Sequence, residues 1–148
     1  MSVFASRAEN TCNALLCEEL RKLGLEAYFE EHFLTRFGTS KPDIHAKWKD
    51  ANYFIEAKQK PRKLVDAVSK AYTYQKRLQA VGPRAVFAVL YPPDCFSSCE
   101  MAVLLNKPPF YVYQSMNSLN ELAQRIYSMI TEPPAFVELN TTDAIKLL

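Results

Sequence analysis

Two carboxylates and a lysine stand close together in the middle of the sequence. Asp43 follows a proline, and Glu56 and Lys58 are separated by one residue at the end of an apolar stretch. Residues i and i+2 of an extended strand point to the same face, so Glu56 and Lys58 should share a face and Ala57 should lie on the other. If the segments that carry Asp43 and Glu56 pair as a hairpin, all three groups meet at one end of a sheet.

Such a group of side chains has the donors for divalent-metal chemistry on phosphate esters. Mg²⁺ prefers oxygen ligands and commonly takes one or two protein carboxylates, keeping waters and substrate oxygens as its other ligands. The metal lowers the pKa of a bound water, and an ammonium group stabilises negative charge on a phosphate. On spacing alone, an ordinary network of surface ion pairs is the more frequent explanation for these residues.

The elements that must position these residues follow from hydrophobic periodicity and from glycine and proline stops. Their order predicts an α/β or α+β domain with a central mixed sheet flanked by helices, in the order α-β-β-β-α-β-β-α. We expect helices at 9–23, 64–81 and 119–130, strands at 25–34, 43–47, 53–57, 85–90 and 110–113, and a loop at 37–42. The predicted domain covers residues 1–132, and residues 133–148 form a tail, helical from Thr141, or the start of a linker.

Length and composition exclude several classes of protein. A chain of 148 residues, 49% hydrophobic and 23% charged, is typical of one globular domain and not of a disordered chain or a coiled coil. No apolar run is long enough to span a membrane, and the N-terminus is too short and polar for a signal peptide. Four cysteines without a secretory signal predict reduced thiols in the cytoplasm.

Positive charge is concentrated in one central segment. Residues 41–84 carry a net charge of +7, whereas the rest of the chain carries −5. A basic segment attracts polyanions, and phosphate contacts are the main source of non-specific affinity for nucleic acids. A solvated helix face explains such a charge cluster equally well.

The arrangement Pro42-Asp43, twelve intervening residues, then Glu56-Ala57-Lys58 resembles the motif of the PD-(D/E)XK nuclease superfamily. The chain is most similar to the nuclease domains of type I restriction-enzyme R subunits and to related phage-defence proteins. Further residues of that pattern are Glu9, Thr11, Leu15, Leu16, Leu20, Leu23 and Gly24 in the first helix, and the segment 82–90. The resemblance implies a restriction-endonuclease-like fold.

The resemblance also implies roles for individual residues. Asp43, Glu56 and the carbonyl of Ala57 would hold Mg²⁺, for which Mn²⁺ can substitute, and Lys58 would be the catalytic lysine. The family often adds a catalytic, metal-binding glutamate from the first helix, a position that Glu9 fits best. Asn13, one turn later, is the alternative, whereas Glu18 and Glu19 are expected to face solvent.

DNA is the partner that the resemblance implies. Several relatives carry Gln-x-x-x-Tyr on the helix after the lysine, and here Lys70 and Tyr74 take those positions. Other candidates for phosphate contacts are Gln59, Lys60, Arg62, Lys63, Lys76, Arg77 and Arg84. Nothing in the sequence resembles a base-reading module, so little sequence preference is expected.

The sequence therefore predicts a metal-dependent DNA endonuclease domain of a restriction or phage-defence system. The alternatives are a catalytically silent copy of this fold that binds nucleic acid or a protein, and a structural module whose basic segment binds an acidic protein. Because the chain has no Gly-rich phosphate loop, a motor or specificity function would belong to a further domain or subunit. The oligomeric state, including a homodimer, and the form of DNA cleaved stay open.

Three other residue types have competing explanations. The pairs Cys12/Cys17 and Cys95/Cys99 lack the two-residue gap of zinc knuckles, so buried apolar cysteines are favoured over a zinc site. His45 should share a face with Asp43, and a half-exposed strand residue is favoured over a phosphate contact. Trp48 could stack on a base or cover the edge of the core, and we favour the core.

Overall fold

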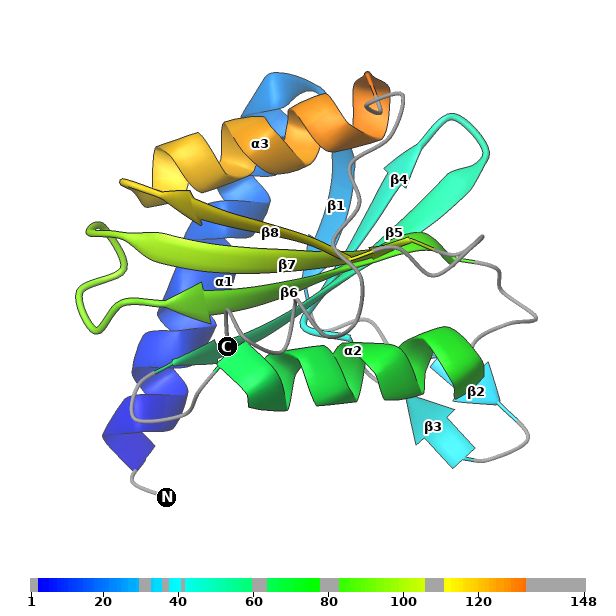
Figure 1. Ribbon diagram of the computed structural model, residues 1–148, viewed down its shortest axis with the longest axis horizontal. Coiled ribbons are helices and arrows are strands. Elements are labelled where there is room, and N and C mark those ends of the chain that lie inside the picture. Colours follow the sequence, from blue (N-terminus) through cyan, green and yellow to red (C-terminus); the bar gives the residue numbers. More distant parts are fainter. Residues whose placement is uncertain are drawn as a thin grey trace.

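The computed structural model describes residues 3–29, 33–35, 38–40, 42–59, 64–77, 83–105 and 111–132. These residues form an α+β fold in which a mixed six-stranded sheet is flanked by three helices (Figure 1). The helices are α1 (Val3–Leu23), α2 (Leu64–Arg77) and α3 (Leu119–Thr131). The strands are β1 (Glu26–Phe29), β2 (Phe33–Thr35), β3 (Gly38–Ser40), β4 (Ile44–Trp48), β5 (Ala51–Gln59), β6 (Pro83–Tyr91), β7 (Cys99–Leu105) and β8 (Tyr111–Met116).

The large sheet has the strand order β1-β4-β5-β6-β7-β8, and β2 pairs with β3 in a separate two-stranded sheet. Only β5 and β6 run parallel, and α2 makes the crossover between them; every other pair in the large sheet is antiparallel. As predicted, β6 is a central strand buried on both faces. Its continuous apolar run reflects contact with helices on both sides.

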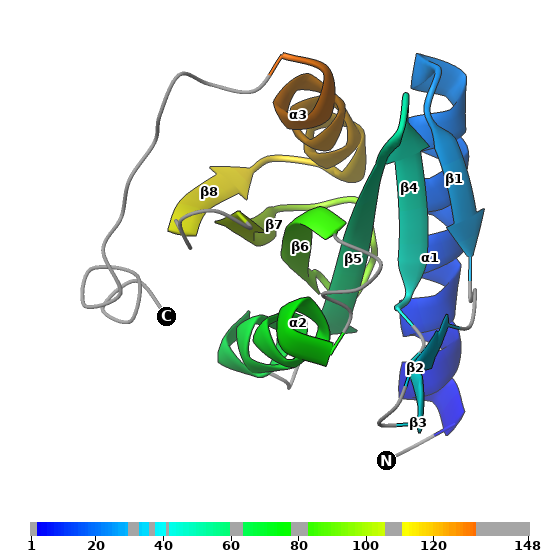
Figure 2. The same ribbon diagram turned by 90° about the vertical axis from the view of Figure 1, so that its right-hand side faces the viewer.

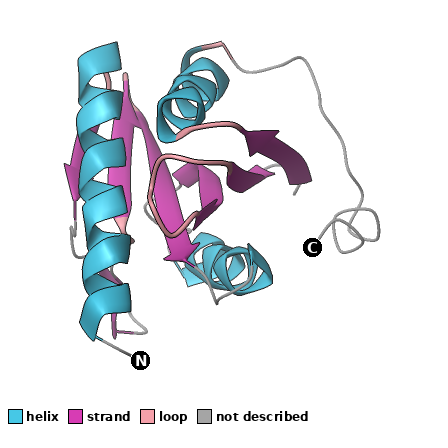
Figure 3. Ribbon diagram, turned by 90° about the vertical axis from the view of Figure 1, so that its left-hand side faces the viewer, coloured by secondary structure: helices cyan, strands magenta, loops and turns pink. Residues whose placement is uncertain are grey.

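The helices divide between the two faces of the sheet. Helix α2 covers one face, while α1 and α3 contact each other on the opposite face (Figures 2 and 3). Alternate residues of β5 enter the two apolar cores, with Ile55 and Ala57 on the α1 side and Phe54 on the α2 side. The period of two along β5 therefore decides which of its side chains face α2.

The sequence prediction was wrong in several places. Strand β7 was not predicted, β3 lies in the expected loop, and the expected strand 25–34 includes β1 and the first two residues of β2. Helix α1 begins at Val3 instead of Glu9, and β5 is longer at both ends than expected. The predicted helix after Thr141 lies outside the described residues. No described helix is long and apolar enough to cross a membrane.

Candidate active site

The hairpin of β4 and β5 brings Asp43 and Glu56 together, as the sequence predicted. Ile44 pairs with Ile55, so Asp43, which directly precedes β4, lies opposite Glu56. The backbone N–H of Ala57 donates a hydrogen bond of 2.8 Å to Asp43 Oδ2. The Asp43 side chain therefore replaces the backbone acceptor that a longer β4 would offer to Ala57. A charge-assisted bond of this kind fixes the carboxylate at the end of the hairpin.

Glu56 and Lys58 project from the α2 side of β5, and Ala57 projects into the core on the α1 side, also as predicted. Glu56 is almost fully buried, with 1% of its side chain exposed. Its Oε1 atom lies 3.1 Å from Lys70 Nζ of α2, whereas its Oε2 atom has no hydrogen-bond partner among the described residues. A buried oxygen without a partner is costly, so this site favours a proton or a cation at Oε2.

Burial raises the pKa values of both carboxyl groups, and the negative charge of Asp43 raises that of Glu56 further. The pKa of Glu56 rises from 4.5 to about 8, first through burial and then through the negative charge of Asp43, while Lys70 and Lys58 oppose the rise. Burial also raises the pKa of Asp43, against the Ala57 N–H and the two lysines. The pair therefore retains a proton near neutral pH when no cation is bound.

The two carboxylates fit a divalent cation. The described residues contain no group of three or more His, Cys, Asp and Glu side chains that could hold a metal ion, so no third side chain of these types joins Asp43 and Glu56. One or two carboxylates suffice for Mg²⁺. The N–H and C=O of a strand residue point to the same side, so we expect the Ala57 carbonyl to point toward Asp43 and to be a third oxygen donor.

Lys58 lies where the buried pair meets solvent. Together with Asp66, Ser69 and Lys70 it lines an open hollow of about 480 Å³ between β5 and α2. Its side chain is partly exposed, so its ammonium group is accessible from the hollow. A substrate phosphate that entered here would meet Lys58 and Lys70 together.

The predicted DNA-contacting residues are only partly described. Lys70 is half exposed and forms the ion pair with Glu56, a contact that the sequence did not predict. Tyr74 lies one turn later in α2, but the position of its side chain is outside the described part of the structure. Lys60, Arg62 and Lys63 also lie outside the described residues.

The two candidates on α1 differ in environment. Asn13 is fully buried, and its Oδ1 accepts a hydrogen bond of 2.7 Å from the hydroxyl of Tyr91 at the end of β6. Glu9 is partly exposed and raises the pKa of that hydroxyl, after the larger effects of burial and Asp43. Both therefore lie near the end of the sheet that carries Asp43, but Glu9 does not complete a metal-holding group with Asp43 and Glu56. Its catalytic role stays a prediction.

A disulfide and a buried glutamine brace this end of the sheet. Cys12 of α1 is joined to Cys95 in the loop after β6, so the prediction of reduced thiols was wrong for this pair; Cys17 and Cys99 are free and buried. Gln59 does not face solvent as a phosphate contact would. It is buried, and its Nε2 donates to the backbone oxygens of Pro92 and Pro93 at 3.2 and 3.3 Å.

The remaining predictions for α1 and β4 have mixed outcomes. Glu18 is exposed and Glu19 is partly exposed, and both contact Lys22. His45 shares the face of Asp43, but it is buried rather than half exposed. Its ring packs edge-on against Phe54, and its Nε2 lies 2.8 Å from Asn52 Oδ1. These contacts give His45 a structural role at this position.

The comparisons with known proteins found little. No family model matches the chain, and no curated protein matches it. Among solved structures, a protein of unknown function designated AF1548 is 15% identical, with a TM-score of 0.45, over 56% of this chain and 45% of that chain. The chain thus spans less than half of that protein's length, and a likeness this weak carries no argument about function.

Proposed function

We propose that this chain is a metal-dependent DNA endonuclease that hydrolyses phosphodiester bonds with little sequence preference, in a restriction or phage-defence system. The observation that carries the proposal is the buried pair of Asp43 and Glu56. One oxygen of the pair has no partner among the described residues, and Lys58 borders it on the solvent side. Perturbed carboxyl groups beside an open hollow are typical of functional sites.

Asp43, Glu56 and the Ala57 carbonyl would hold the metal ion, which when bound supplies Lewis acidity and a water of lowered pKa. Lys58 would stabilise the negative charge that develops on the phosphate oxygens as the bond to the leaving oxygen breaks. Lys70 lies 3.1 Å from Glu56 and opposes the rise of its pKa, and its half-exposed ammonium can also contact a phosphate. The basic segment 41–84 would supply non-specific affinity for DNA.

One observation favours the alternative, a catalytically silent module that binds nucleic acid. The ammonium of Lys70 already lies 3.1 Å from Glu56, so the site has an internal cation that partly neutralises the carboxylates. Such a module would bind DNA through the same basic segment and would cut nothing.

A plasmid-nicking assay separates the two functions. The full chain is incubated with supercoiled plasmid in Mg²⁺, Mn²⁺ or EDTA, alongside Asp43→Ala, Glu56→Gln and the control Glu18→Gln, which changes an exposed glutamate of α1. We expect nicking in either metal, none in EDTA, a loss in both site variants and no change in the control. Plasmid binding without nicking in any metal would instead favour the silent module.

A further inference from the structure

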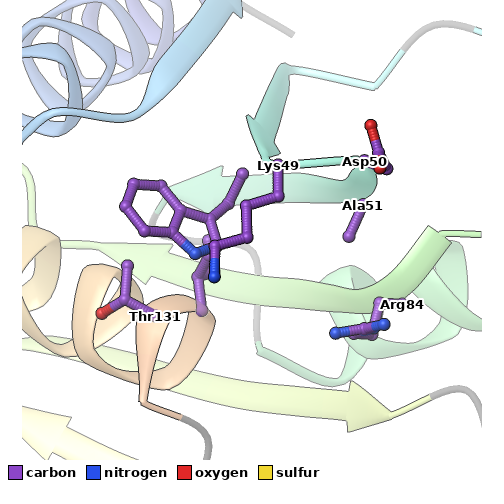
Figure 4. Close-up of a pocket in the computed structure, with 7 residues that line it drawn as sticks. Lys49, Asp50, Ala51, Arg84 and Thr131 are labelled. Carbon is purple, nitrogen blue, oxygen red and sulfur yellow. The ribbon is translucent and has the colours of Figure 1, made fainter.

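A second hollow lies at the opposite end of β5 from Lys58. It is bounded by the turn between β4 and β5, the beginning of β6 and the end of α3 (Figure 4). Its volume of about 420 Å³ falls within the range of small-molecule sites. The lining residues are Trp48, Lys49, Asp50, Ala51, Arg84, Ile130 and Thr131. Ala51 and Glu56 are five residues apart on β5, so this hollow is about 17 Å from the carboxylate pair.

The backbone of the hairpin turn is unusual at Lys49. Trp48 pairs with Ala51, so Lys49 and Asp50 alone form the turn. Lys49 has φ of 56°, in the left-handed region that glycine and asparagine normally occupy in hairpin turns. A lysine is an unfavourable choice for this conformation, and here it places an ammonium group beside the hollow (Figure 4).

A second irregularity involves Arg84. Asn52 pairs with Pro83 and Tyr53 pairs with Ala85, so Arg84 is an extra residue on β6 at a shift in register. An extra residue of this kind changes the direction of its side chain, and bulges occur often beside functional sites. Two independent departures from regular backbone therefore bring two cationic side chains to the same hollow. Backbone outliers that converge on one cavity point to a function for that cavity.

Neither cation is neutralised locally. Among the described residues, Lys49 and Arg84 have no ion-pair or hydrogen-bond partner, although Asp50 also lines the hollow. Figure 4 shows the Asp50 carboxylate directed away from the Arg84 guanidinium. The hollow therefore offers positive charge to an incoming anion.

The rest of the lining is apolar and aromatic. Trp48 is partly buried and packs edge-on against Tyr127, with ring centroids 6.2 Å apart, which holds the indole in position. Ile130 is buried, and the Thr131 hydroxyl donates to the Tyr127 carbonyl at 2.9 Å, leaving its oxygen able to accept a hydrogen bond. An indole beside two cations matches a planar base joined to a phosphate.

We propose that this hollow binds a nucleoside phosphate, with its base against Trp48 and its phosphate between Lys49 and Arg84. The ligand is either a free nucleotide or one nucleotide unit of a nucleic-acid strand, because both present the same chemistry. The site does not depend on the carboxylate pair, which lies at the other end of β5.

A structural explanation competes with this one. The last turn of α3 has no basic residue, and cations stabilise the negative end of a helix dipole. If Lys49 and Arg84 serve only this purpose, their removal would lower the melting temperature and leave ligand binding unchanged. Binding and melting must therefore be measured on the same variants.

Trp48 is the only tryptophan of the chain, so its fluorescence reports on this hollow alone. The full chain is titrated in EDTA with thymidine 5′-monophosphate, thymidine, inorganic phosphate and a single-stranded oligothymidylate of eight nucleotides. We expect saturable quenching by the monophosphate or the oligonucleotide, and weaker effects of thymidine and phosphate. Similar affinities for the monophosphate and the oligonucleotide would identify a free nucleotide as the ligand. Binding of the oligonucleotide alone would identify a nucleic-acid strand.

Lys49→Gln and Arg84→Gln should each weaken this binding at least tenfold. Arg125→Gln is the matched control, because Arg125 is an exposed cation of α3 that lies outside the basic segment 41–84 and does not line the hollow. Its affinity should stay within twofold of the wild type. The proposal is overturned if no probe changes the fluorescence of Trp48. It is also overturned if Lys49→Gln and Arg84→Gln have lower melting temperatures but bind the probes like the wild type. Because metal is absent, failure of plasmid nicking does not affect this result.

Discussion

The two ends of β5 carry charge in contrasting ways. At the Lys58 end, regular strand geometry and a buried ion pair hold opposite charges together: Asp43 bonds to the Ala57 N–H, and Glu56 contacts Lys70. At the Ala51 end, Lys49 and Arg84 sit on irregular backbone and have no partner among the described residues. The first end is suited to hold a cation, and the second is suited to receive an anion.

The two ends also differ in how they are held. The Cys12–Cys95 disulfide, the Gln59 contacts and the Asn13–Tyr91 hydrogen bond all brace the Lys58 end. The other end depends on side-chain packing between Trp48 and Tyr127. A brace of this kind keeps functional groups in place without a ligand, whereas a packed hairpin can adjust as a ligand enters. The two proposed sites on β5 would therefore have separate requirements for rigidity.

The largest effect is expected when the brace is removed. Cys12→Ser combined with Cys95→Ser opens a loop whose ends are 83 residues apart, and loss of that link should lower the free energy of unfolding by about 4–5 kcal/mol. Urea unfolding measures the change, with Cys17→Ser as the control for loss of a buried free thiol. Hydrogen exchange should rise at residues 89–99 and stay unchanged at the hairpin turn. Equal increases in hydrogen exchange at residues 89–99 and at the hairpin turn would contradict the conclusion that only the Lys58 end of β5 is braced.

Lys58→Met tests whether the braced end performs catalysis. The substitution keeps much of the side-chain length and removes the charge, so single-turnover cleavage of saturating DNA should fall about 10²–10³-fold. DNA affinity should fall by no more than one phosphate contact, and the salt slope by about one unit. Lys22→Met, an exposed lysine of α1, is the control. Cleavage at the wild-type rate by Lys58→Met would make Lys58 a mere phosphate anchor.

The raised pKa of Glu56 predicts an unusual dependence of stability on pH. Between its ordinary value of 4.5 and about 8, the folded chain keeps the Glu56 proton and the unfolded chain loses it, so stability falls as pH rises through this range. Glu56→Gln removes the titration, and the variant should gain about 1–3 kcal/mol on the wild type between pH 5 and pH 8 in EDTA. Urea unfolding at both pH values measures this gain, and Glu18→Gln should show none.

The same proton predicts how metal affinity depends on pH. A cation must displace it, so Mn²⁺ should bind more tightly as pH rises toward 8, by up to about tenfold per pH unit. Calorimetry in buffers of different ionisation enthalpy measures the released proton. Metal affinity that is independent of pH below 8 would contradict a cation at Glu56.

The smallest effect is expected at Lys49. Lys49→Gly removes a side chain from left-handed backbone and should raise stability by about 0.5–1 kcal/mol, while ligand-induced quenching of Trp48 weakens. Lys49→Ala is the matched control, since alanine keeps the unfavourable backbone and also removes the charge. If the glycine variant is no more stable than the alanine variant, the left-handed backbone at Lys49 does not destabilise the protein, and no function is needed to explain why a lysine occupies it.

The sequence predicted how Asp43, Glu56 and Lys58 are placed relative to one another, because short-range rules determine their placement. The period of two along residues 53–58 decides which side chains of β5 share a face of the sheet. The polar turn at Lys49 and Asp50 decides which residues of β4 and β5 lie opposite each other. Strand β7 was not predicted because it lacks alternation and follows the turn-rich segment 92–98. The period of an isolated segment does not distinguish a strand buried on both faces from a loop or a helix.

The contacts that depend on tertiary packing could not be predicted. Cys12 and Cys95 are too far apart in sequence for spacing to suggest their bond. Lys70 meets Glu56 only because α2 crosses β5 at one particular place. The shift in register at Arg84 leaves no mark on the residue pattern, so Arg84 looked like one more basic side chain.

The placement of α1 has a consequence for biosynthesis. Among the described elements α1 is made before all others, and β1 and β5, which contact it, follow soon after. Its other contacts come later: Tyr91 is the last residue of β6, Cys95 lies in the loop after it, and α3 ends at Thr131. At the usual rate of translation, the ribosome needs about 5–20 s to pass from Leu23 to Thr131. Throughout that interval the side of α1 that contacts α3 stays uncovered, so this side of the helix would be a binding site for chaperones on the nascent chain.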